Sequence, residues 1–173
     1  LFRSSAAAVQ LTPGATANAT VRLDVLPGWH VNANPPALDY NIPTTVKIRG
    51  GFGVTAGKPV YPPPHKQKFA FEETEMWVFD GTTEVQVPLT AGATAENGEH
   101  VLRGTVEYQG CNNEVCLAPT SVPFTVTVTI TGGAPAAAAG AAPDTGDAVG
   151  EEPAAAEGDT IGTPYPDRTG FAS

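Results

Sequence analysis

The stretch "VPFTVTVTI", residues 122 to 130, alternates apolar side chains with proline or threonine along its whole length. Successive side chains of an extended chain point to opposite faces, so all the apolar members of this stretch share one face. The pattern therefore predicts a β-strand with one buried and one exposed face. The residues expected on the buried face are Val122, Phe124, Val126, Val128 and Ile130.

The same alternation recurs in three other places, at residues 19–26, 83–89 and 100–108. Their predicted inward residues are Val21, Leu23, Val25, Val85, Val87, Leu89, Leu102, Val106 and Tyr108. Shorter strands are predicted in "WHVNA", "TTVKI" and "EMWVF". Glycine- and proline-rich turns separate these runs, and no segment before residue 131 has a helical period. We therefore expect an all-β domain over residues 1–131, an immunoglobulin-like antiparallel β-sandwich.

After Thr131 the composition changes to alanine, proline and glycine with scattered acidic residues. Such a segment buries too little apolar surface to offset the entropy of ordering it. We expect residues 132–173 to be a disordered or extended linker.

Charge argues against several classes of partner. The formal net charge is -9, and residues 132–173 hold seven acidic residues and one arginine, which leaves the rest near -3. Without a basic patch, nucleic acid is an unsuitable partner. No apolar run is long enough for a membrane span, and the first residues lack the layout of a signal peptide. We read the chain as a processed piece of a longer protein.

The only two cysteines, Cys111 and Cys116, lie in "VEYQGCNNEVCLAPT", residues 106 to 120. Strands are predicted on both sides, so this stretch is expected to be a hairpin connection. Opposed residues of an antiparallel pair have Cα atoms about 4.5 to 5.5 Å apart, within the range that a disulfide tolerates. Asn112 and Asn113 tolerate left-handed backbone, which suits a four-residue loop that sets the two thiols opposite each other.

A disulfide over so short a loop is a weak staple. Closing about six residues stabilises the native state by roughly 2.2 kcal/mol, against about 4.7 kcal/mol for about 100 residues. From the spacing alone three uses stay open: an inert local disulfide, redox exchange and a metal site. Zinc lacks a paired ligand motif, whereas copper(I) could use Cys111, Cys116 and Met76.

Four stretches resemble the N-terminal periplasmic domain of the DsbD-type thiol:disulfide interchange proteins. They are "LPGWHVNANPP" at 26–36, "YPPPHKQKF" at 61–69, "TEMWVFDGTTEVQVPL" at 74–89 and "VEYQGCNNEVCLAPTSVPFTV" at 106–126. They occur in the family's order, and the cysteine element with its following Pro119 is the most specific. One departure is that the best-known type has five residues between its cysteines, where this chain has four.

The resemblance implies an immunoglobulin-like protein-disulfide reductase domain of the bacterial periplasm, with no bound cofactor. In that family a thioredoxin-like domain donates electrons to the N-terminal domain. The N-terminal domain then reduces oxidised thioredoxin-fold proteins, including those of cytochrome c biogenesis. The full-length protein would be tethered through a membrane domain. The alternative from the residues alone is a non-enzymatic immunoglobulin-like binding module with a structural hairpin disulfide.

By the same resemblance, Cys116 forms the intermolecular bond and Cys111 resolves it. A cap loop with an aromatic side chain shields the family's cysteines, and its counterparts here are Phe69 or Phe71. His30 and Asn32 match positions that neighbour the cysteine pair, and His30 is a candidate for proton transfer.

Plainer interpretations stand beside these. Phe69 and Phe71 could be ordinary core residues, and His30 a hydrogen-bonded strand histidine. Two lysines, Lys66 and Lys68, replace acidic residues of the family's cap loop and would favour a thiolate if they approached it. Tyr108 and Gln109 could pack beside the cysteines, although the strand pattern favours the core for Tyr108. Core positions are expected for Trp29 and Trp77, and solvated ones for Glu75 and Glu107.

Overall fold

The computed structural model describes residues 1–133, which form strands and no helix. No helix long and apolar enough to cross a membrane occurs among them. The strands are β1 (Phe2–Ala6), β2 (Val9–Leu11), β3 (Thr16–Val25), β4 (His30–Asn32), β5 (Thr45–Ile48), β6 (Val54–Ala56), β7 (His65–Gln67), β8 (Met76–Phe79), β9 (Thr82–Ala91), β10 (Gly98–Tyr108), β11 (Gly110–Cys111) and β12 (Thr120–Ile130). The predicted linker lies outside the described residues from residue 134 on.

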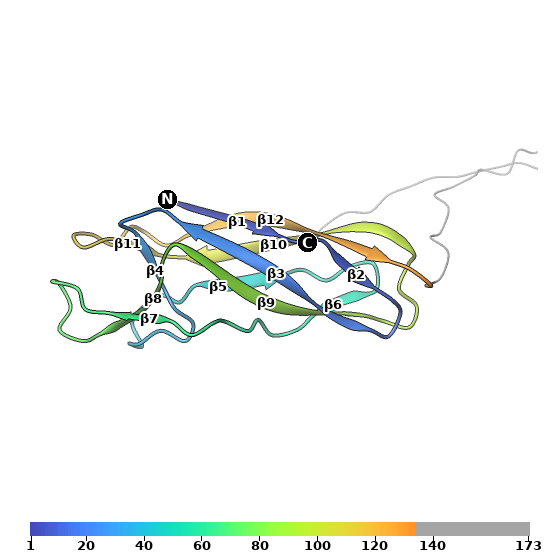
Figure 1. Ribbon diagram of the computed structural model, residues 1–173, viewed down its shortest axis with the longest axis horizontal. Coiled ribbons are helices and arrows are strands. Elements are labelled where there is room, and N and C mark those ends of the chain that lie inside the picture. Colours follow the sequence, from blue (N-terminus) through green and yellow to red (C-terminus); the bar gives the residue numbers. More distant parts are fainter. Residues whose placement is uncertain (134–173) are drawn as a thin grey trace, which may run out of the picture. The chain divides into compact units, whose positions relative to one another are not determined.

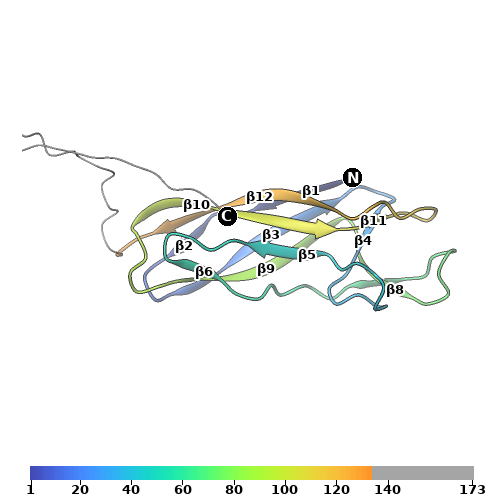
Figure 2. The same ribbon diagram turned by 180° about the vertical axis from the view of Figure 1, so that it is seen from behind.

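Two four-stranded sheets face each other in an immunoglobulin-like β-sandwich (Figure 1). Their strand orders are β1-β3-β9-β6 and β2-β12-β10-β5. A third sheet, β11-β4-β8-β7, lies at one end of the sandwich, and the reverse view shows the same arrangement (Figure 2). The strands of this third sheet have two to four residues each, whereas β3, β9, β10 and β12 have ten or eleven.

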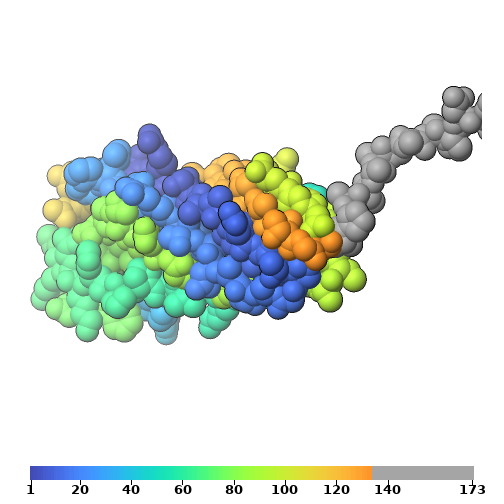
Figure 3. All heavy atoms as spheres, turned by 45° about the vertical axis from the view of Figure 1, so that its right-hand side comes forward, coloured from blue at the N-terminus to red at the C-terminus, as the bar shows by residue number. Residues whose placement is uncertain are grey.

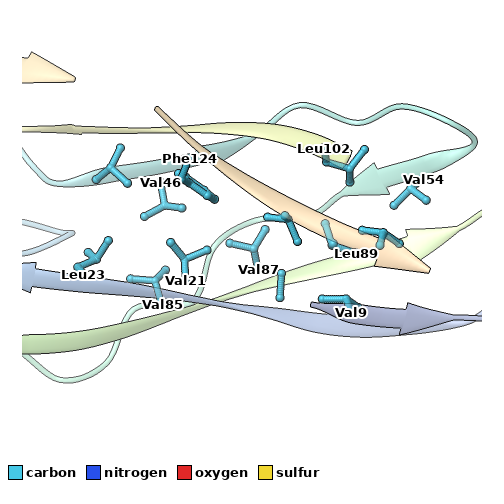
Figure 4. Packing of buried hydrophobic residues seen from close by; sticks show 14 of the residues in the cluster. Val9, Val21, Leu23, Val46, Val54, Val85, Val87, Leu89, Leu102 and Phe124 are labelled. Atoms are coloured by element: carbon cyan, nitrogen blue, oxygen red, sulfur yellow. The ribbon is translucent and has the colours of Figure 1, made fainter. Parts of the chain in front are cut away.

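The sandwich core is built from the alternating faces of the long strands. Every inward residue predicted in β3, β9 and β10 is buried, and so are those of β12 except the half-buried Val122. Side chains from the two sheets meet between the layers, as Figure 4 shows for Val21 and Val87 from one sheet and Phe124 and Leu102 from the other. The prediction of an all-β sandwich is therefore confirmed. The period-two pattern explains why each long strand has one apolar face that packs against the other sheet.

The sequence patterns missed several strands. The structure adds β1, β2, β6, β7 and β11, all of which have five residues or fewer. It also contains one parallel pair, in which Val9 to Leu11 of β2 lies beside Val128 to Ile130 of β12. The sandwich is therefore mainly, but not wholly, antiparallel. The three short strands that were predicted are present as β4, β5 and β8.

Candidate functional site

Both cysteines lie in the connection between β10 and β12. These strands pair from Gly98 with Ile130 up to Tyr108 with Thr120, so the chain beyond this last pair extends as a loop. Within it β11 follows β10 and pairs with β4, which places Cys111 opposite His30. Cys111 and Cys116 are bridged by a disulfide with an S–S distance of 2.09 Å. The predicted hairpin connection is thus observed, with the disulfide across its narrow part.

Side-chain hydrogen bonds hold the loop in shape. The side-chain oxygen of Asn112 accepts hydrogen bonds from the backbone N–H groups of Glu114 and Val115, both at 2.8 Å. Gln109 donates from Nε2 to the Leu117 carbonyl at 3.0 Å. Among the described residues other than glycine, only Phe52 has a positive φ, so the expected left-handed asparagines are not used. Asn112 shapes the loop through its side chain instead.

The two cysteines differ sharply in accessibility. Cys111 is 1% exposed, whereas Cys116 is exposed to solvent. The strand that holds Cys111 pairs with β4, and the side chain of Leu1 packs against the neighbouring Gly110. In the space-filling view the cysteine loop, drawn in yellow and orange, forms part of the outer surface at the end of the domain (Figure 3). Of the two cysteines, Cys116 is therefore the one open to solvent.

His30 lies next to the buried cysteine and under an aromatic ring. It is 4% exposed, and its ring stacks on that of Phe69 with centroids 4.1 Å apart. Its Nε2 is buried without a hydrogen-bond partner, so it is not the hydrogen-bonded strand histidine of the plainer interpretation. Burial lowers the pKa of His30, and the negative charge of Asp80 opposes this effect. The imidazole is therefore neutral at pH 7 and able to accept a proton.

Asn32 follows two residues later on β4 and has the same buried environment. Its Nδ2 donates to the Ile42 carbonyl at 2.9 Å, which ties the segment before β5 to the third sheet. Its Oδ1 is buried without a partner. Asn32 thus anchors the loop that follows β4, and a contact with the cysteines is not among its hydrogen bonds.

The two candidate cap residues have different environments. Phe69 is buried in a small cluster with Met76 and Val78, and it also covers His30. Phe71 is exposed and stacks on the outer side of Phe69, with centroids 5.5 Å apart. Of the two candidates, Phe69 is the one that contacts His30, whose backbone pairs with Cys111, and it is also a buried packing residue. A cap role for it stays a prediction. Cys116 remains exposed with the loop in this position.

A hydrogen bond at 2.7 Å, from the Tyr40 hydroxyl to a carboxylate oxygen of Glu72, joins this loop to the segment before β5. It raises the pKa of Tyr40 and lowers the pKa of Glu72. Both side chains are exposed, so the bond is a modest restraint on the loop.

A cleft of about 510 Å³ lies between these parts. It is bounded by the loop after β3, by Trp29 and His30, by Phe69, by the Asp80–Gly81 turn and by Asn113 of the cysteine loop. The structure thus brings together Phe69, His30 and the cysteine loop around one opening. Asp80 was missed by the sequence reasoning because "DGTT" was read only as a turn signal.

A family model described as "Thiol:disulfide interchange protein DsbD, N-terminal" matches residues 1–128. The chain belongs to this family. It is therefore a thiol:disulfide exchange domain, and its Cys111 and Cys116 are joined in a disulfide.

Comparisons with solved structures give matches at low sequence identity. The N-terminal periplasmic domain of ScsB from Proteus mirabilis is 14% identical with a TM-score of 0.48, and the match covers 72% of this chain and 44% of that one. The chain therefore spans less than half of that structure. A type I cohesin–dockerin complex with OlpC from Clostridium thermocellum is 8% identical, with a TM-score of 0.42 and coverage of 76% and 95%. The seventh ScaB type I cohesin from Pseudobacteroides cellulosolvens is also 8% identical, with a TM-score of 0.44 and coverage of 79% and 96%. A comparison with curated proteins found no match.

Several other predicted neighbours lie elsewhere. Tyr108 is buried and stacks on Phe2 at 4.1 Å, as expected for a core residue. The Nζ of Lys66 lies 5.6 Å from the ring centroid of Trp77, so this lysine is directed to an aromatic face. Lys68, Glu75 and Glu107 are exposed. Trp29 and Trp77 are only half-buried, because both lie at the third sheet and its cleft instead of between the large sheets.

The copper(I) alternative draws on Met76. This methionine is buried between Phe69 and Val78, and within residues 1–133 no group of three or more His, Cys, Asp or Glu side chains could hold a metal ion. As a packing residue, Met76 supports the loop that carries Phe69.

Proposed function

We propose that this domain is a protein-disulfide reductase that accepts electrons from a thioredoxin-like domain and passes them to disulfides of exported proteins. The observation that carries the proposal is the unequal exposure of the two cysteines across one disulfide. A disulfide between one exposed and one buried cysteine supports attack at a defined atom and release of a defined leaving group. Membership of the DsbD N-terminal family supports the same chemistry.

Loading the domain with electrons takes two exchange steps. A thiolate of the donor attacks Sγ of Cys116, the Cys111–Cys116 bond breaks, and Cys111 leaves as a thiolate that takes up a proton. The second donor thiolate then attacks the donor sulfur of this mixed disulfide. The donor becomes a disulfide, Cys116 is released, and two electrons have moved to the domain.

Unloading runs through the same atoms. The Cys116 thiolate attacks a substrate disulfide and forms a mixed disulfide, which releases the first substrate thiolate. Cys111 must then lose its proton and attack Sγ of Cys116, which restores the domain disulfide and releases the second substrate thiolate. A buried thiol does not lose its proton easily, so a nearby base speeds this resolving step.

His30 is the base that we assign to the resolving step. Its backbone lies opposite Cys111, and its lowered pKa keeps the imidazole neutral at pH 7. The unpartnered Nε2 is free to take the Cys111 proton. Phe69 covers the imidazole on the side away from the strand and limits access of water to it. Asn32 fixes the segment after β4 and so supports the position of His30.

Exposed apolar residues around Cys116 support contact with a protein. Val115 and Leu117, which flank it in sequence, are 47% and 42% exposed, and Phe71 and Leu26 are exposed at the same end of the domain. Such residues are suited to transient burial by a folded partner. We assign both donor and acceptor to thioredoxin-fold proteins and the domain to the bacterial periplasm, tethered to a membrane domain in the full-length protein. These assignments follow from the resemblance of the chain to the family. Cytochrome c biogenesis is one process that would use the reduced domain.

Mixed-disulfide trapping with two matched variants tests the proposal. Cys111→Ser leaves only Cys116, and Cys116→Ser leaves only Cys111. Each variant is mixed with an oxidised thioredoxin-like domain, and adducts are counted by mass spectrometry after alkylation. We expect a rapid adduct with Cys111→Ser and little or none with Cys116→Ser. Equal adducts, or a faster one through Cys111, would contradict the assigned roles. Circular dichroism of both variants confirms that the comparison is between folded proteins.

A further inference from the structure

Asp80 carries the only carboxylate among the residues that line the cleft beside the cysteine loop. It lies in the tight turn between β8 and β9, where Gly81 has a φ of 56° that favours glycine. The Gly81 carbonyl accepts a hydrogen bond at 2.8 Å from the backbone N–H of Val25, at the end of β3. The turn is therefore fixed to the sandwich, and the carboxylate is held at the edge of the cleft.

A second residue orients this carboxylate. His65, on β7, pairs with Val78 of β8, and its Nδ1 lies 2.6 Å from Oδ1 of Asp80. Both side chains are partly exposed, so the contact orients the group more than it stabilises the fold. The sequence places these two residues fifteen positions apart, and only the β7–β8 pairing brings them together.

The buried imidazole of His30 lacks any other counter-charge in the cleft. When it takes a proton it becomes a cation at a site that is 4% exposed, and an unpaired buried cation is costly. The charged side chains on the neighbouring elements are Lys66 on β7, four on the loop that carries Phe69 (Lys68, Glu72, Glu73 and Glu75), and Glu114 on the cysteine loop. Glu72 is half-buried and the others are exposed, and none of them lines the cleft. Asp80 is thus the group placed to stabilise the imidazolium.

We propose that Asp80 is a positioning residue of the exchange reaction, whose carboxylate stabilises the imidazolium that His30 becomes when it takes the Cys111 proton. The inference rests on the proposed function. In the resolving step the proton passes from Cys111 to His30, the Cys111 thiolate attacks Sγ of Cys116, and the substrate sulfur leaves with the electron pair of the broken bond. Asp80 takes no part in bond making and acts through His30.

The first test measures the His30 titration directly, by NMR of the imidazole in the oxidised protein, where neither cysteine titrates. Asp80→Asn removes the charge and keeps the shape, Asp80→Glu keeps the charge, and Glu99→Gln removes a carboxylate from the far end of β10. We expect Asp80→Asn to lower the pKa of His30, and the other two variants to leave it close to that of the wild type. A pKa of His30 that is unchanged in Asp80→Asn would overturn the inference.

The second test follows the reaction with an aryl disulfide, 5,5′-dithiobis(2-nitrobenzoate), and the reduced domain. Attack by Cys116 releases the first thionitrobenzoate, and attack by Cys111 on the mixed disulfide releases the second. We expect Asp80→Asn to slow the second release several-fold, to leave the first nearly unchanged, and to move the acid limb of the second phase to lower pH. Asp80→Glu should restore the wild-type profile.

The outcomes separate this inference from the proposed function. A slower second phase with an unmoved acid limb would mean that Asp80 only supports the turn, and would contradict its electrostatic role. If the wild-type domain forms no adduct with a thioredoxin-like domain, the proposed function fails. The NMR titration still decides whether Asp80 sets the pKa of His30.

Discussion

The sandwich and the third sheet differ in strand length and in what they bury. Between β3, β9, β10 and β12 the core is apolar, and the large side chains at its centre are fully buried. The third sheet has strands of two to four residues, and the segment from β4 to β5 holds four buried polar atoms without partners, on His30, Asn32, Asn41 and Thr44. Stability is therefore concentrated in the sandwich, and reactive groups are concentrated at its end.

This separation of a stable sandwich from a reactive end suits a domain whose disulfide opens and closes in every reaction cycle. A loop of about six residues contributes roughly 2.2 kcal/mol to stability when bridged, a minor part of the 5 to 15 kcal/mol that is usual for a folded domain. The long β10–β12 ladder continues to hold the two ends of the loop when the disulfide is reduced. The dithiol form should therefore keep the native sandwich.

The largest effect is expected from Cys116→Ser. It should abolish disulfide reduction, because the exposed cysteine is lost, while the free energy of unfolding falls by only about 2 kcal/mol. Insulin reduction coupled to a thioredoxin-like donor measures the activity, and urea denaturation measures the stability. A fall in stability large enough to unfold the sandwich would show that the disulfide is a structural bond.

Leu89→Ala should have the converse effect. Leu89 is fully buried at the centre of the sandwich, and a leucine-to-alanine change in such a place costs about 2 to 5 kcal/mol. We expect the lower stability in urea denaturation, with an unchanged rate of adduct formation at 25 °C. Val101→Ala on the exposed face of β10 is the matched control and should change stability little. A slower adduct in Leu89→Ala would show that the two regions are not independent.

Gly104→Ala probes a closer fit within the core. Gly104 is paired with Phe124 across β10 and β12, and a Cβ there would overlap the phenylalanine ring. We expect a loss of about 1 to 3 kcal/mol from overpacking. In the double variant Gly104→Ala with Phe124→Leu the loss should be smaller than the sum of the two single losses. Additive losses would contradict the contact, and thermal unfolding of the four proteins gives the comparison.

The smallest effect is a dependence of stability on pH that comes from the third sheet. Burial lowers the pKa of His30, so the native state binds a proton there less readily than the unfolded chain. Stability from this residue is complete above the ordinary pKa of about 6.5. It falls as the pH falls through 6.5 toward the lowered native value. His30→Gln should flatten the curve of unfolding free energy in that window, and an unchanged slope would show that His30 is not the group responsible.

The sequence predicted the sandwich well because its long strands carry a strict period-two pattern that burial enforces. Val85, Val87 and Leu89 are examples of residues that the pattern placed correctly. It missed β7, whose three residues are all exposed and so show no alternation. It also missed the parallel pairing of β2 with β12, since partner choice depends on residues far apart in the chain.

The candidate site was predictable in part. The cysteine spacing and the resemblance pointed to Cys111 and Cys116, but the burial of Cys111 alone depends on the folded structure, in which its strand pairs with β4. The choice between Phe69 and Phe71 needed the stacking on His30, which a sequence pattern does not contain. In the sequence Asp80 was recognisable only as part of a turn, because its position beside the cleft depends on the folded structure.

The most direct test of the relay is the reduction potential of the Cys111–Cys116 pair. It is obtained by equilibration in glutathione or dithiothreitol buffers, with mass-spectrometric counting of alkylated thiols. A carrier between a thioredoxin-like donor and exported substrates should lie between roughly -270 and -180 mV. A value well below about -300 mV is typical of a structural disulfide, and it would contradict the relay and favour a binding module with a locally stapled loop.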